Sequence, residues 1–151
     1  MIKILDDIID KKLQDEIENL LFDPHCSWHY NPYTVTKEEE SKHAEKYNLS
    51  NELLNNVVDT QMFVHSITRG KHIDCEKTSI VCAEILKQFQ TRASFPIELV
   101  YRIQSNLQIR DGNISEEQHN VIHIDNDDPH WVIIYYVNDT DGDTLFFNEN
   151  N

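Results

Sequence analysis

Residues 119–147, HNVIHIDNDDPHWVIIYYVNDTDGDTLFF, constrain the fold of this chain more than any other stretch. They combine a polar triplet, His123-Ile124-Asp125, with HWVIIYYV at 130–137, the most apolar run in the sequence. β-Branched and aromatic residues are frequent in both parts, and such residues favour extended backbone. The stretch therefore predicts a polar site that is held on a buried sheet.

The triplet has the spacing of two metal ligands on a strand. Residues two apart along a strand point to the same face and lie about 6 to 7 Å apart, so His123 and Asp125 can converge on one ion. His119 would lie about 13 Å from His123 along the strand, too far to share that ion. The pattern predicts two ligands of a 2-His-1-carboxylate site, with the third from elsewhere. The alternative interpretation is a histidine that is only packed or capped.

The apolar run predicts a central strand. Both alternating faces of residues 130–137 are apolar, which is typical of a strand covered on both sides. Residues 138–143, with Asp141-Gly142 at their centre, predict a turn before a short strand at 144–147.

Residues 123–147, HIDNDDPHWVIIYYVNDTDGDTLFF, resemble the first half of the catalytic core of the prolyl 4-hydroxylase-like dioxygenases, which depend on 2-oxoglutarate and Fe(II), and especially the short versions found in marine phages. The resemblance implies an α+β, mainly β fold: a double-stranded β-helix, or jelly roll, with two flanking N-terminal helices. It implies His123 and Asp125 as the first two iron ligands, 2-oxoglutarate as cosubstrate and ascorbate as an optional reductant. Tyr136 matches a position that often touches 2-oxoglutarate in this family, although a core tyrosine with a satisfied hydroxyl is the alternative.

The chain departs from the family after the turn. The family uses a distal histidine as third ligand, and a Lys or Arg beyond it to pair with the far carboxylate of 2-oxoglutarate. This chain has no histidine after His130 and no Lys or Arg after Arg110. We therefore expect an incomplete jelly roll, the N-terminal portion of a dioxygenase whose gene is truncated, split or decayed. The alternative is an inactive or split jelly-roll fragment that acts as a binding or assembly module, with a second chain completing the core.

The implied function is the hydroxylation of a protein side chain or a small molecule. The chain has 13 Lys and Arg residues against 27 Asp and Glu, a net charge of −14, which argues against nucleic acid and anionic membranes as partners. No signal peptide or run of 18 apolar residues is present, so we expect a cytoplasmic protein, in the host cytoplasm if it is phage-encoded. Its three cysteines, Cys26, Cys75 and Cys82, lack C-x-x-C spacing and predict neither a disulfide framework nor a zinc site.

The remaining sequence predicts a single domain over residues 1–151, with helices and support strands in 1–97 and the first jelly-roll strands in 98–151. Apolar stripes at helical spacing predict two helices, and alternation predicts strands, while the charged and polar stretch 37–56 is the least structured part. The predicted helices cover 6–22 and 75–89, and the predicted strands cover 2–5, 61–67 and 98–110, with turns at 69–71 and 111–113.

A strand like 98–110 precedes the His-x-Asp strand in the family, and polar residues on it can face the cosubstrate. Arg102 and Asn106 are therefore candidates for contact with 2-oxoglutarate. A solvent-facing polar row is the alternative.

Overall fold

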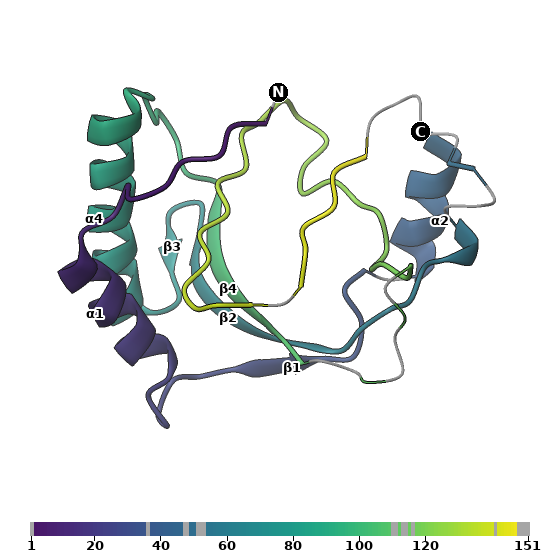
Figure 1. Ribbon diagram of the computed structural model, residues 1–151, viewed down its shortest axis with the longest axis horizontal. Coiled ribbons are helices and arrows are strands. Elements are labelled where there is room, and N and C mark those ends of the chain that lie inside the picture. The colour runs from purple at the N-terminus through teal and green to yellow at the C-terminus, as the bar shows by residue number, and fades with distance from the viewer. Residues whose placement is uncertain are drawn as a thin grey trace. The chain divides into compact units, whose positions relative to one another are not determined.

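The structure is a computed structural model, and it describes residues 2–35, 37–46, 49–50, 54–109, 112, 115, 117–140 and 142–147. Its elements form an α+β fold, as the sequence predicts (Figure 1). The described helices are α1 (Lys11–Leu21), α2 (Lys37–Lys46) and α4 (Glu76–Ala93). The described strands are β1 (His29–Asn31), β2 (Met62–Arg69), β3 (His72–Ile73) and β4 (Arg102–Gln108).

The strands form one open sheet. Strands β1, β2 and β3 are neighbours in that order, and β4 also pairs with β2. The predicted turn at 69–71 is confirmed, because β2 and β3 form an antiparallel hairpin in which Arg69 faces His72. Gly70 has φ +57°, a left-handed conformation that glycine adopts without strain. Of the predicted turn at 111–113, only Gly112 lies within the described residues.

The chain divides into two compact units, each with its own core. The α1–α4 unit comprises Met1–His29 and Val64–Asn106, and the α2 unit comprises Tyr30–Phe63 and Leu107–Asn151. In the α1–α4 unit, Ile67 of β2 is 1 % exposed, and it is buried together with Leu13 and Ile17 of α1 and Val81 of α4. In the α2 unit the buried apolar residues are Val35, Met62 and Val121.

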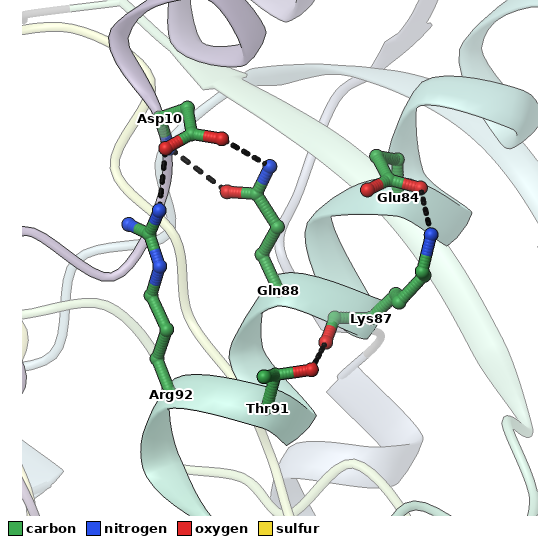
Figure 2. A pocket seen from close by; sticks show the side chains of 6 residues that line it. All are labelled: Asp10, Glu84, Lys87, Gln88, Thr91 and Arg92. Carbon is green, nitrogen blue, oxygen red and sulfur yellow. Dashed lines mark hydrogen bonds and ion pairs between the residues drawn. The ribbon is translucent and has the colours of Figure 1, made fainter.

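Helix α1 starts at Lys11, later than the predicted start near Asp6, because the residues before it are held by α4. Arg92 donates from Nη1 to the carbonyls of Asp7 and Ile8, both at 3.1 Å, and pairs with the Asp10 carboxylate. Gln88 donates to the same carboxylate at 2.7 Å and accepts from the Asp10 backbone N–H at 2.9 Å. Figure 2 shows Gln88 and Arg92 reaching from α4 to Asp10 at a shallow pocket of about 200 Å³. The polar groups of Asp10, Gln88 and Arg92 are hydrogen-bonded to one another, so the role of this pocket is to join the start of α1 to α4.

Several predicted strands are absent from the described residues. Neither 2–5, 119–125, 130–137 nor 144–147 forms a strand, so the structure has an open sheet and does not show a jelly roll. The prediction that 130–137 is covered on both faces is also wrong, since Trp131 is 64 % exposed and Val132, Ile134 and Tyr136 are about half exposed. A strand needs a neighbour to accept its backbone hydrogen bonds, and propensity alone does not provide one.

The charged segment expected to be least structured contains helix α2. Glu and Lys dominate its sequence, KEEESKHAEK, and both have high helix propensity. None of the described helices combines the length and the apolar character that crossing a membrane requires.

Candidate metal-ligand pair

The segment that carries His123 and Asp125 is anchored at its N-terminal end to residues 56–60 of the same unit. His119 forms a parallel bridge with Val57: its N–H donates to the Asn56 carbonyl at 3.0 Å, and its carbonyl accepts from the Val58 N–H at 2.8 Å. The next residue, Asn120, accepts a hydrogen bond of 2.5 Å from the Thr60 hydroxyl. The side chain of Val121 is 4 % exposed and fixes the segment in the core.

Beyond this anchor, His123 has one ring nitrogen committed and one available. Nδ1 lies 2.9 Å from the Val121 carbonyl, which can only accept, so Nδ1 carries the proton and Nε2 keeps its lone pair. A backbone carbonyl that holds Nδ1–H in this way is the usual arrangement behind a histidine that binds metal through Nε2. His123 and Asp125 are two residues apart and both exposed, so a metal ion can reach them. Their imidazole nitrogen and carboxylate oxygen are donors that suit such an ion.

The loop that follows the pair is held by a lysine. Lys46, in the last turn of α2, forms an ion pair with Asp127. The hydrogen bond and the charge of Lys46 lower the pKa of the Asp127 carboxyl, with a smaller contribution from His43. Asp127 is therefore committed to Lys46 and is a poor candidate for a further metal ligand.

A third ligand is not in place. Among the described residues, no three His, Cys, Asp or Glu side chains are grouped closely enough to hold a metal ion. His119 has Nδ1 within 2.8 Å of the Asn120 carbonyl, and its buried Nε2 has no hydrogen-bond partner in the described part of the chain. Its ring lies against Phe147, with centroids 5.2 Å apart. The segment thus carries one imidazole and one carboxylate, donor types that non-haem iron takes, and among the described residues no third donor is grouped with them.

The predicted cosubstrate residues lie in different units. Tyr136 belongs to the α2 unit, is exposed, and its hydroxyl hydrogen-bonds to the hydroxyl of Thr144. Arg102 and Asn106 are exposed residues of β4 in the α1–α4 unit, and Asn106 accepts from the Gln104 side chain at 3.0 Å. Contact of these three residues with 2-oxoglutarate stays a prediction.

Sequence reasoning missed a second group of reactive side chains, in the α1–α4 unit. Cys26, Cys75 and His65 line one pocket of about 490 Å³, although they are far apart in sequence. The signal available in the sequence was the position of Cys75, directly before a strongly periodic helix.

Comparison of the chain with protein-family models, with curated proteins and with solved structures found no match.

Proposed function

We propose that this chain carries part of the core of an oxygenase that depends on Fe(II) and 2-oxoglutarate, with His123 and Asp125 as metal ligands. The observation that supports the proposal best is the ring orientation of His123. Its Nδ1–H is held by the Val121 carbonyl, so Nε2 is presented as a ligand on an exposed segment. A carboxylate two residues further on supplies the oxygen donor that non-haem iron prefers beside imidazole.

The proposed roles of the other residues follow from their chemistry. Fe(II) and 2-oxoglutarate, when bound, would supply the hydroxylation of a substrate C–H bond by O2, with one oxygen atom entering the substrate and the other entering succinate as CO2 is released. Tyr136 has a hydroxyl that can turn from Thr144 to a carboxylate, and Arg102 has a guanidinium that can pair with one. Asn106 would orient the cosubstrate through its amide. The substrate is a protein side chain or a small molecule.

The proposal requires a third ligand that the described residues do not group with His123 and Asp125. A segment or a second chain that pairs with 119–125 and 130–137 would complete a jelly roll and could bring that ligand with it. The exposed apolar side chains at 131–136 are the surface on which added strands would pack.

Anaerobic titration of the chain with Fe(II) in the presence of 2-oxoglutarate tests the proposal, with the weak visible charge-transfer band of an iron-bound 2-oxo acid as the readout. We expect a band that is lost in His123→Ala and in Asp125→Ala. His130→Ala is the matched control. The Nδ1–H of His130 also donates to a carbonyl two residues back, that of Asp128 at 2.7 Å, but the residue two positions after His130 is Val132 and not an aspartate.

Two outcomes would count against this assignment. A band that survives both substitutions would mean that the metal binds elsewhere. The absence of a band in folded wild-type protein would mean that the pair alone does not bind iron under these conditions, which favours the second candidate function. His119→Ala, added to the series, shows whether the buried Nε2 of His119 becomes the third ligand.

The second candidate is an assembly module without catalysis. It is favoured by the apolar side chains that the α2 unit exposes, a set comprising Trp131, Val132, Ile133, Ile134, Tyr136, Leu145 and Phe146. Contiguous exposed apolar residues of this kind mark surfaces that another chain covers. Sedimentation velocity over a range of concentrations tests this function: we expect association of the wild type and a monomer for Ile134→Asp. A wild type that stays monomeric at all concentrations would argue against self-assembly.

A further inference from the structure

The α1–α4 unit contains a pocket of about 490 Å³ in which two cysteines lie beside basic groups. Cys26 and Cys75 both line it, with Arg69 and Lys77 as the cationic side chains and His25 and His29 as the imidazoles that also contribute to the wall. Asp23 and Asp74 line it too, but Asp74 is occupied by the Ser66 hydroxyl at 2.6 Å and by Arg69 and His72. A pocket of this volume accepts a small molecule, and Lys77 on its wall can pair with an anionic group of that molecule.

A buried histidine holds the two cysteine-bearing segments together. His65 is 2 % exposed; its Nδ1–H donates to the carbonyl of Ser27, the neighbour of Cys26, at 2.9 Å. Its Nε2 lies 3.1 Å from the hydroxyl oxygen of Thr78, in the first turn of α4. The hydrogen bonds of His65 therefore run from the loop that carries Cys26 to the start of the helix that follows Cys75.

Cys75 occupies the N-cap position of the 18-residue helix α4, where backbone N–H groups lack partners within the helix. Partial burial raises the pKa of its thiol, but the hydroxyl and N–H of Thr78 and the N–H and charge of Lys77 outweigh that effect and hold the pKa below its ordinary value. The thiolate is the reactive form of cysteine, so this position favours reaction.

The other two thiols have the opposite character. Burial raises the pKa of the Cys26 thiol, and the nearby Cys75 adds to the increase, which is consistent with both lining one pocket. Burial raises the pKa of Cys82 to about 11. Cys82 is buried in the core and does not line the pocket. The pKa of the Cys75 thiol is thus lowered, whereas those of Cys26 and Cys82 are raised, and only Cys26 and Cys75 line the pocket.

We propose that the pocket is a thiol–disulfide exchange site in which Cys75 reacts with a low-molecular-weight disulfide bearing carboxylates, and Cys26 then closes a disulfide with Cys75. In the first step the Cys75 thiolate forms a bond to one sulfur of the small disulfide, whose S–S bond breaks and releases one thiolate. In the second step Cys26 loses its proton to solvent and attacks Cys75 Sγ, releasing the second small thiolate. Two protein thiols are oxidised and one small disulfide is reduced to two thiols.

A basic group explains the choice of ligand. Lys77, two residues after Cys75, can pair with a carboxylate of the incoming disulfide and place its S–S bond near Cys75. This site is independent of the proposed oxygenase function, since all its residues belong to the α1–α4 unit, whereas His123 and Asp125 belong to the α2 unit.

Oxidised glutathione, a small disulfide with four carboxylates, is the probe. The reduced full-length chain is mixed with it near neutral pH, quenched with acid at intervals and measured by intact mass and peptide mapping. We expect the wild type to pass through a glutathione adduct and to end as a protein that has lost two hydrogen atoms, with Cys26 joined to Cys75. Cys26→Ser should stop at a stable adduct on Cys75, and Cys75→Ser should react at least about tenfold more slowly, because burial raises the pKa of both thiols that remain. Cys82→Ser should behave as the wild type.

Three results would overturn the proposal. Cys75→Ser that reacts as fast as the wild type would show that Cys75 is not the attacking thiol. A wild type that keeps the adduct on Cys75 without closure would remove the role of Cys26. Reaction that occurs only after unfolding in urea would show that the folded pocket does not take the ligand. Lys77→Gln, which leaves all three thiols in place, should slow the first step, and an unchanged rate would refute the role of this basic group; circular dichroism verifies that each variant is folded.

Discussion

Replacement of Ile67 by alanine tests whether β2 carries the core of the α1–α4 unit. Ile67 is 1 % exposed in β2, whereas Ile73, in the strand that pairs with β2, is 57 % exposed. The same substitution can therefore be made at a buried and an exposed isoleucine of one hairpin. We expect Ile67→Ala to lower the free energy of unfolding strongly and Ile73→Ala to leave it nearly unchanged.

The expected loss follows from the atoms that are removed. Truncation of isoleucine to alanine deletes three carbons, and at about 0.8 kcal/mol for each buried CH₂ the transfer contribution is roughly 2.4 kcal/mol. The cavity left behind adds to this, since the surrounding core relaxes only in part, so we expect about 3 to 4 kcal/mol in total. The same change at an exposed site costs within about 0.5 kcal/mol.

Urea unfolding followed by the fluorescence of Trp28 is the assay, in a background that carries Trp131→Phe. Trp28 belongs to the same unit as Ile67, and its ring lies 5.7 Å from the ring of His65, so its emission reports on that unit. With a denaturant slope of about 1 to 3 kcal/mol per molar, the midpoint for Ile67→Ala should fall by at least about 1 M. Equal midpoints for the Ile67 and Ile73 variants would refute the assignment of this core.

Three further predictions concern the same unit. Trp28→Phe removes the indole N–H that donates to the Leu21 carbonyl at 3.1 Å, and we expect a loss of about 1 kcal/mol in urea unfolding; no loss would mean that water replaces the bond. The hydrogen bond and charge of Arg92 hold the pKa of the Asp10 carboxyl below its ordinary value, so its contribution to stability is present above about pH 4 and is lost as the pH falls through the lower folded pKa. The melting temperature of Arg92→Gln should therefore fall less than that of the wild type between about pH 5 and 2. Parallel plots of melting temperature against pH for the two proteins would contradict this linkage. Cys82, whose pKa burial raises to about 11, should resist iodoacetamide in the folded protein and react in urea; rapid labelling of the folded protein would show that it is accessible.

The sequence predicts best those elements that have a regular apolar pattern and that also pair with another part of the fold. The helix predicted at 75–89 is present as α4, because its apolar positions repeat at helical spacing over several turns. The strands predicted at 61–67 and 98–110 are present as β2 and β4, although β4 is shorter than predicted. For these segments local propensity and tertiary pairing favour the same structure.

The start of α1 could not be predicted, because contacts distant in sequence determine it. The left-handed conformation of Asp7, φ 55°, and the bonds from Arg92 to the two carbonyls before the helix depend on α4. The charge density of residues 37–46 predicts an irregular surface, but their helix propensities favour the helix that the structure shows there, α2.

At the candidate site, the sequence triplet suggests the two candidate ligands, His123 and Asp125, but it does not predict the contacts that hold them. The bond from His123 to the Val121 carbonyl is a local contact that depends on the backbone between them, which is not the regular strand that alternation predicts. The pocket lined by Cys26 and Cys75 could not be predicted from the sequence for a different reason. Its two thiols are brought into one cavity by His65, a residue whose strand position gives no indication of its partners.

The pairing of α1 with α4 has a consequence for synthesis of the chain. The hydrogen bond from Arg92 to Asp7 spans 85 residues, so α1 leaves the ribosome well before its partner has been made. At about 5 to 20 residues per second, the interval is roughly 4 to 17 s. An isolated helix shorter than about 12 residues is marginal in water, and α1 has 11 residues, so the segment should stay unfolded during that time. Its leucine and isoleucine stripe is then available to chaperones until α4 emerges.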